Sequence, residues 1–274
     1  MSKSVSYTLS DLIKIMKKLR DPENGCPWDV EQTFETILPY TLEEAYEVAE
    51  AIDQGDMAEL KTELGDLLFQ VIFHSQMAEE QKAFTINDVI HEISEKMVVR
   101  HPHVFGNKHI KDAEAQTIAW EEQKTRERQA KADKLGRKPS ILDDVPSALP
   151  ALLRASKLQK RAAKVGFDWP EISQVVDKMQ EELGELSEAI AAKQGQDKQA
   201  HIEEELGDML FVCANLARHL DINPEEALRK ANQKFIRRFQ YIENSCHAQK
   251  RSMDECTLEE MEELWIEAKT LEKQ

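Results

Sequence analysis

An internal duplication constrains this fold more than any other feature. The segments 43–52 (EEAYEVAEAI) and 181–190 (EELGELSEAI) are two versions of one acidic phrase. Each is followed by a second phrase, ELGDLLF at 63–69 and ELGDMLF at 205–211, in which six of the seven residues are identical. A repeat spaced by roughly 140 residues in a chain of 274 residues predicts two halves of related structure.

Helical patterns run along nearly the whole chain. Across 206–220 apolar residues recur at three- and four-residue steps, while Glu205, Asp208 and Asn215 lie on a neighbouring stripe of the same helix. Asn223 before a proline predicts one helix start, and Thr257 begins a capping box. Alternating runs of strand length are scarce. The sequence therefore predicts an all-α fold, with duplicated helical-bundle domains.

Glycines mark two places in each repeat. Gly55 and Gly195 lie between the paired acidic segments, as expected for the turn of an α-hairpin. Gly65 and Gly207 lie inside the expected second helices, where glycine costs about 1 kcal/mol relative to alanine. That cost favours a close approach at these points, either by backbone, by a metal-bound ligand or through tight helix packing.

Composition suggests where the halves join. The stretch 124–138 is locally basic, and three prolines follow it before residue 151. We expect an N-terminal domain at 1–125, a linker at 126–148 and a C-terminal domain at 149–274.

Charge and cysteine usage limit the partners and the compartment. The chain has 52 acidic and 36 basic residues, and its net charge of −16 argues against a nucleic-acid polymer or an anionic membrane as the main partner. The four cysteines show no C-x-x-C spacing, which is typical of reduced thiols. No apolar run reaches membrane-spanning length, and the start lacks a signal-peptide core. We expect a cytoplasmic protein.

The repeated carboxylates predict metal sites. On a helix, Glu182 and Glu185 project from one face, as do Glu205 and Asp208, and antiparallel packing would bring the four together. Four such groups need a compensating cation, and hard oxygen ligands suit Mg²⁺, with Mn²⁺ as a possible substitute. The first half predicts a possible second metal site at Glu44, Glu47, Glu63 and Asp66. The alternative is that these glutamates only form solvated helix faces.

Further motifs carry a resemblance to a known family. Besides E-E-x-x-E and E-x-x-D, the chain has GCPWD at 25–29, RHPHVF at 100–105 and NQKF at 232–235. In this combination it resembles the MazG family over essentially its full length. The resemblance implies an all-α, Mg²⁺-dependent enzyme that splits nucleoside triphosphates into a monophosphate and pyrophosphate. It also implies a homodimer with helices from both subunits around each site, and a house-cleaning or nucleotide-pool role.

The chemistry fits the acidic residues. Breaking the bond between the α- and β-phosphoryl groups needs charge neutralisation and a nucleophilic water, which metal ions supply without a covalent nucleophile. The candidate catalytic residues are Glu181, Glu182, Glu185, Glu204, Glu205 and Asp208. Which carboxylate accepts the proton of the water stays open.

Nearby cations favour the second half as the main catalytic site. Lys178 lies one turn before the first acidic pair and His201 one turn before the second, where the first half has Tyr40 and Glu59. The first half keeps its own acidic set, so we expect it to be weaker, structural or regulatory.

A later helix offers phosphate contacts. Lys234 and Arg238 lie four apart and suit phosphate oxygens, and by the resemblance they and Trp265 match positions that contact the nucleotide. The substrate-binding candidates are therefore Lys178, Glu181, His201, Glu204, Lys234, Arg238 and Trp265. The first half offers Lys96, Arg100 and Trp120 as counterparts.

Several alternatives to these interpretations remain to be weighed. Trp28 and Trp169, which precede the first acidic segment of each half, either wall a base pocket or pack in the core. His101 and His103 flank a proline, where a structural corner is favoured over a metal pair. A di-iron protein is disfavoured because neither repeat has E-x-x-H. A non-enzymatic nucleotide-sensing or protein-interaction module would instead use the acidic faces without binding metal.

Overall fold

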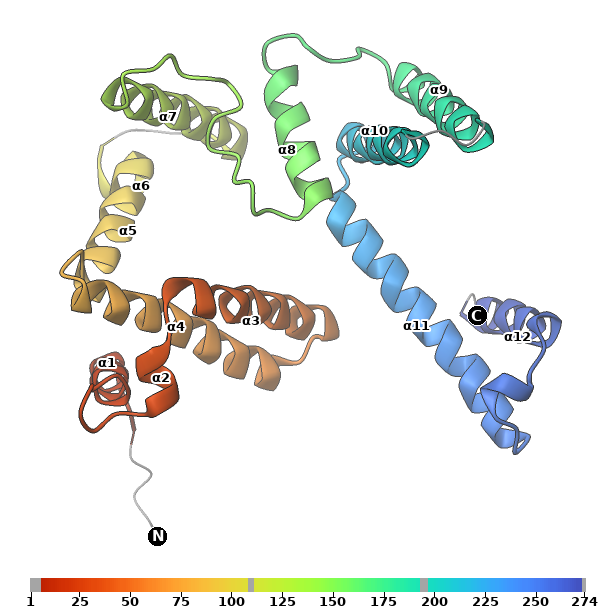
Figure 1. Cartoon of the computed structure of the whole chain (residues 1–274). Helices are drawn as coiled ribbons and strands as arrows, with labels where there is room; N and C mark the ends of the chain where they lie inside the picture. Colours follow the sequence, from red (N-terminus) through yellow and green to blue (C-terminus); the bar gives the residue numbers. More distant parts are fainter. Residues whose placement is uncertain (1–5, 108–110, 193–196, 273–274) are drawn as a thin grey trace. The chain divides into compact units, whose positions relative to one another are not determined.

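The computed structural model describes residues 6–107, 111–192 and 197–272, which form helices and the segments that connect them, with no strand in these ranges (Figure 1). The all-α prediction is confirmed. None of the helices in these ranges is long and apolar enough to cross a lipid bilayer.

The first compact unit spans Met1–Gln123. Its helices are α1 (Leu9–Leu19), α2 (Pro27–Glu31), α3 (Phe34–Gln54), α4 (Met57–Glu80), α5 (Ile86–Arg100), α6 (Pro102–Phe105) and the first part of α7 (Ala113–Lys134). The core gathers Met16, Ile37, Ile72 and Phe73, each almost fully buried. Full burial of such a side chain contributes roughly 1.5–3 kcal/mol, so this cluster fixes α1 and α3 against α4.

The second compact unit spans Lys124–Gln274. It contains the rest of α7, then α8 (Ala151–Ala163), α9 (Ile172–Ala191), α10 (Lys198–His219), α11 (Pro224–Ala248), the short 3₁₀ helix η1 (Met253–Glu255) and α12 (Leu258–Leu271). α10 packs against α9 and α8, and α11 packs against α12. Val175 of α9 and Ala214 of α10 are fully buried.

The acidic segments lie on paired helices in both units: α3 with α4, and α9 with α10. α3 ends at Gly55, whose positive φ of 69° is the left-handed conformation that glycine adopts most easily. Gly195 lies outside the described residues. Two predicted helix starts are confirmed, because the Asn223 side chain caps α11 and Thr257 forms a capping box at α12.

The division between the units falls inside a helix. It lies between Gln123 and Lys124, and α7 continues to Lys134. The expected domain limits at 125 and 148 stay predictions.

Candidate active site

Three acidic side chains converge between α9 and α10. Glu182, Glu205 and Asp208 each offer a carboxylate oxygen, and these oxygens lie within 4.8 Å of one another. Oxygens that share one Mg²⁺ at about 2.1 Å lie no more than about 4.2 Å apart, so small side-chain adjustments suffice to close this set around an ion. Glu182 is buried, with 4% of its surface exposed, which makes a compensating cation necessary.

Glu185 lies beside this set and is not one of its three members. Partial desolvation raises the pKa of the Glu185 carboxyl; Lys178 opposes the shift, and Glu182 and Glu205 add to it. The side chain therefore lies within the electrostatic field of the acidic set, and its role as a fourth ligand stays a prediction.

Lys178 provides the compensating charge when no metal is bound. Its Nζ lies 2.6 Å from Oε1 of Glu181 and 2.9 Å from Oε1 of Glu182. These two hydrogen bonds raise the pKa of Lys178 above its ordinary value. A bound divalent cation would replace the ammonium at Glu182, which would free Lys178 for a phosphate oxygen.

His201 is the second cation-capable group at the acidic set. Its Nδ1 lies 3.4 Å from Oε1 of Glu205 and 3.9 Å from Oε2 of Glu204. In the first half the matching position is Glu59, a carboxyl group that hydrogen-bonds to Glu63 and offers no positive charge to the acidic set. The two sites differ in electrostatic surroundings as the sequence predicts.

The first half has its own acidic set between α3 and α4. Oxygens of Glu44, Glu63 and Asp66 lie within 4.8 Å of one another. Buried Gln70 donates from Nε2 to Oε1 of Glu44 over 3.4 Å. Burial raises the pKa of Glu44, and the charges of Asp66 and Glu47 add to the shift. Glu47 thus resembles Glu185: it lies near the set without belonging to its three members.

Glu63 has a strongly raised pKa in the first site. Burial raises its pKa from 4.5 to about 7, and the hydrogen bond to Glu59 and the charges of Glu47, Glu59 and Asp66 contribute. The folded-state pKa lies above the unfolded value. The contribution of Glu63 to the free energy of unfolding is therefore fully present below pH 4.5 and is lost as pH rises through about 7.

We predict that Glu63→Gln raises the melting temperature of magnesium-free protein at pH 8 and leaves it nearly unchanged at pH 4. The neutral amide removes a charge that the folded state holds poorly at pH 8, whereas at pH 4 the wild-type carboxyl is protonated in the folded state and mostly protonated in the unfolded state. Calorimetric melts at both pH values, each compared with wild type, provide the measurement. A variant less stable than wild type at pH 8 would contradict the assignment.

The helix glycines require a correction. A Cβ built on Gly65 or Gly207 would meet nothing within 4 Å among the described residues, so neither the expected close approach of backbone nor tight packing occurs at either position. The glycines leave open space one residue before Asp66 and Asp208. This space is compatible with an approaching metal-bound ligand, which stays a prediction.

The other substrate-binding candidates lie on the α11–α12 hairpin. Arg238 pairs with Glu272, with Nε and Nη2 at 2.8 and 2.7 Å from Oε2, and its guanidinium lies 5.4 Å from the Trp265 ring centre. Phe235 contacts the same ring at 5.3 Å, and Lys234 is exposed. These contacts are internal to the hairpin and do not connect Arg238 or Trp265 to the acidic set.

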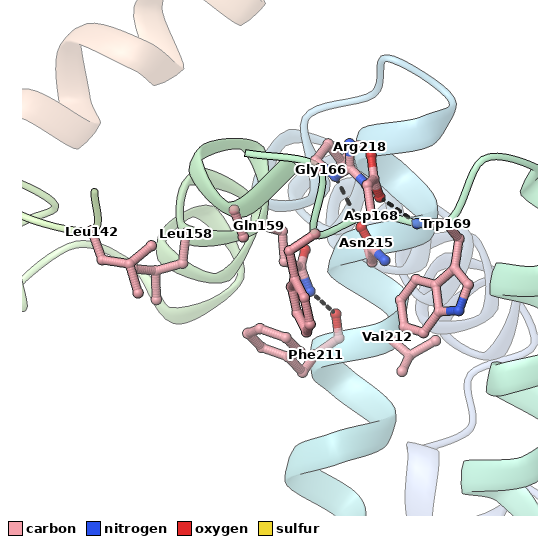
Figure 2. A pocket seen from close by; sticks show the side chains of 12 residues that line it. Leu142, Leu158, Gln159, Gly166, Asp168, Trp169, Phe211, Val212, Asn215 and Arg218 are labelled. Carbon is pink, nitrogen blue, oxygen red and sulfur yellow. Dashed lines mark hydrogen bonds and ion pairs between the residues drawn. The ribbon is translucent and has the colours of Figure 1, made fainter. Parts of the chain in front are cut away.

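A cavity of about 510 Å³ lies between α8, α10 and the connection before α9 (Figure 2). Trp169 and Phe211 line it, together with the buried Asn215. Arg218 donates to Oδ1 of Asn215 over 2.9 Å and forms an ion pair with Asp168. Sequence patterns singled out Trp169 and placed Asn215 on the stripe of Glu205 and Asp208. They missed Phe211 and Arg218, which continue the steps 208, 211, 215 and 218 along the same face of α10.

The aromatic counterparts in the first half make different contacts. Trp28 is half exposed and meets Tyr40 edge-on at 6.0 Å, and Trp120 donates from Nε1 to the Arg100 carbonyl over 3.0 Å. Lys96 lines a separate cavity at α5.

The H-x-H pair forms a corner between two helices. α5 ends at Arg100 and α6 begins at Pro102, and His101 contacts the Met97 carbonyl through Nδ1 at 2.7 Å. The metal-capable groups found in the described ranges contain neither His101 nor His103.

Comparison with known proteins identifies the family. A model of the MazG nucleotide pyrophosphohydrolase domain matches residues 32–105 and 171–242, once over each acidic helix pair. The chain belongs to the MazG family. It is 51% identical over 261 residues to the nucleoside triphosphate pyrophosphohydrolase of Escherichia coli (strain K12), covering 95% of this chain and 97% of that protein.

Two further relatives extend the comparison. The Thermotoga maritima nucleoside triphosphate pyrophosphohydrolase/pyrophosphatase MazG is 42% identical over 268 residues, or 97% of this chain and 98% of that protein. The uncharacterized protein YabN of Bacillus subtilis is 44% identical over 271 residues, which cover 99% of this chain and 53% of YabN. The resemblance predicted from the motifs is confirmed.

Proposed function

We propose that this MazG-family enzyme hydrolyses nucleoside triphosphates to nucleoside monophosphates and pyrophosphate with Mg²⁺, and that Mn²⁺ can substitute. The observation that carries the proposal is the convergence of Glu182, Glu205 and Asp208 within 4.8 Å, in a domain matched by the family model. Full-length similarity to the Escherichia coli and Thermotoga maritima enzymes agrees with it. A cytoplasmic house-cleaning or nucleotide-pool role fits this activity.

The residues of the second half divide the work between them. Glu182, Glu205 and Asp208, with Glu185, would hold the metal. When bound, the metal supplies charge neutralisation on the triphosphate and a nucleophilic water. Lys178 and His201 lie at the edge of this set and orient phosphate oxygens by charge-assisted hydrogen bonds.

One of the carboxylates at the site would accept the proton of the attacking water. Glu181 and Glu204 are exposed and lie next to the ligands, so each is a candidate general base beside the ligands themselves.

We predict that Glu182→Gln lowers pyrophosphate release by about 100-fold or more, because a metal contributes several kcal/mol of transition-state stabilisation. The matched variant Glu44→Gln, at the corresponding position of the first half, should leave turnover largely intact. Pyrophosphate release with Mg²⁺ and a panel of canonical, deoxy and modified triphosphates provides the measurement.

A larger loss from Glu44→Gln than from Glu182→Gln would assign turnover to the first half instead. The non-enzymatic alternative predicts no pyrophosphate release from any triphosphate and no Mg²⁺-dependent rise in melting temperature.

The cavity at α10 is a candidate binding site for the nucleoside, next to the acidic set of Glu182, Glu205 and Asp208. Asp208 and Asn215 are seven residues apart on one face, which is about 10 Å along the helix axis. A triphosphate held at Glu205 and Asp208 would thus place its base near Trp169 and Asn215. Trp169 offers a surface on which the base can stack. Asn215 accepts a hydrogen bond from Arg218 at Oδ1, and its amide nitrogen can donate to an acceptor atom of the base.

We predict that Trp169→Ala raises KM for nucleoside triphosphates by about 10-fold with little change in kcat, since base stacking is worth roughly 1–3 kcal/mol. Inhibition by inorganic tripolyphosphate, which has no base, should be unchanged. Trp28→Ala is the matched control in the first half and should leave KM unaltered. Equal weakening of tripolyphosphate inhibition would show that Trp169 only supports the fold.

A homodimer would bring the α11–α12 hairpin to a phosphate site. Arg238 and Trp265 make their contacts within the hairpin, while Phe235 and Ile236 beside them are 56% and 53% exposed. Leu210 on α10 is 47% exposed as well. We propose that the hairpin of one subunit covers the acidic set of its partner, because isologous pairing of these surfaces would bury both apolar regions.

Subunit mixing tests this arrangement. Glu182→Gln and Arg238→Ala should each inactivate a homodimer. If every site combines both subunits, a co-refolded equimolar mixture should regain about a quarter of wild-type activity, because half the dimers then contain one intact site. Separately refolded samples, mixed just before the assay, are the control. Sites built within one subunit would give no recovery.

A further inference from the structure

Two cysteines meet where α11 leads into α12. Cys246 lies in the last turn of α11 and is 1% exposed, and Cys256 follows η1 directly. Their Sγ atoms are 2.8 Å apart. This separation is shorter than the about 3.5–4.0 Å at which non-bonded carbon atoms pack, and within about 1 Å of a disulfide bond length. The fold therefore holds two free thiols almost at bonding distance.

The segment that carries Cys256 is held in place independently of the sulfurs. Arg251 binds both carboxylate oxygens of Glu260, over 3.0 and 2.8 Å, and donates to the Glu255 carbonyl. This ion pair lowers the pKa of Glu260 to about 2, so it persists at neutral pH. Bringing the sulfurs together therefore needs little further ordering of the chain.

A small oxidant can approach the pair. A cavity of about 250 Å³ is lined by both Cys246 and Cys256. Cys256 is partly exposed to solvent, whereas Cys246 is buried. Attack at Cys256 followed by resolution at Cys246 is the order that this accessibility favours.

We propose that Cys246 and Cys256 are an oxidative modification site, at which hydrogen peroxide converts the two thiols into a disulfide that fastens the α11–α12 hairpin. The Cys256 sulfur attacks one peroxide oxygen: an S–O bond forms, the O–O bond breaks, and the departing oxygen leaves as water with the thiol proton. The Cys246 sulfur then attacks Cys256: the S–S bond forms, the S–O bond breaks, and a second water leaves. Two thiols lose two electrons, and one hydrogen peroxide becomes two waters.

Thiol reactivity limits how fast this happens. The hydrogen bond with Cys246 and burial raise the pKa of Cys256, and the Arg251 guanidinium opposes the shift. Because the thiolate is the reactive form, the pair resists brief exposure to peroxide and responds to sustained exposure. A dithiol reductant reverses the bond by exchange.

The disulfide would act on the hairpin that carries Arg238 and Trp265. Cys246 lies eight residues after Arg238, about 12 Å along α11. The Arg238–Glu272 ion pair joins α11 to the end of α12, and the thiol pair joins the end of α11 to the segment before α12. Oxidation would thus add a covalent link at the connecting end of the hairpin, where the Arg251–Glu260 ion pair already holds the segment between the helices.

The test uses the full-length protein, oxidised with hydrogen peroxide, quenched with catalase, alkylated and mapped as peptides without reductant. We expect a linked Cys246–Cys256 peptide and a melting temperature higher by roughly 5 °C, both reversed by dithiothreitol. Neither readout depends on turnover, so the result is independent of the proposed activity.

Two variants separate the disulfide from general oxidation. Cys256→Ser removes the attacking sulfur and should abolish both the linked peptide and the stabilisation, while Cys213→Ser, at an exposed position on α10, should retain both. Alkylation of Cys246 and Cys256 as free thiols after peroxide treatment would overturn the proposal. So would an equal rise in the melting temperature of Cys256→Ser.

Discussion

Repulsion among carboxylates held close together is the interaction on which the rest of this structure depends. In each half two helices bring three acidic side chains within 4.8 Å, and in each set one glutamate is buried. Such a set costs free energy unless a cation, a proton or a lysine compensates it. The second half uses Lys178 against Glu182, and the first half holds Glu63 with a pKa of about 7. Both the lysine and the raised pKa reduce the repulsion within an acidic set.

This difference in compensation separates the two copies more clearly than their ligand sets do. A lysine at the edge of a metal set stays charged after the metal binds, so it becomes available to the anionic substrate. A protonated glutamate releases its proton when the metal binds and adds no positive charge. The same four acidic positions in each half therefore support different roles, and the positions that distinguish them are Lys178 and His201 against Tyr40 and Glu59.

Local sequence patterns predicted the helices well and the site only in part. The caps at Asn223 and Thr257, the turn at Gly55 and the family were all predictable, because each depends on neighbouring residues or on a repeated phrase. Sequence spacing placed Glu182, Glu205 and Asp208 on facing helices, but it could not distinguish the three converging oxygens from the neighbouring Glu185. That distinction depends on how α9 is rotated against α10.

Two of the three explanations for the helix glycines were wrong for a related physical reason. Gly65 and Gly207 were expected to face a close neighbour, yet a Cβ would meet open space at both. Glycine inside a helix indicates that another group approaches the backbone there. It does not indicate whether that group belongs to the folded chain or to a bound ligand. The cysteine pair shows the same limit: ten residues separate Cys246 from Cys256, and only the break between α11 and η1 turns the chain back and brings the two sulfurs together.

The apolar surfaces left exposed on the helices link these features. Phe235, Leu210 and Phe211 are each between 45% and 56% exposed, although charged residues are abundant elsewhere in the chain. Phe211 lies one turn after Asp208, so part of this surface borders the acidic set of Glu182, Glu205 and Asp208. When water leaves an acidic site that is bordered by apolar side chains, the local dielectric constant falls. Charge–charge interactions within the site then become stronger. Covering the site with substrate and a second subunit would thus raise both the binding of the metal and its effect on the phosphates.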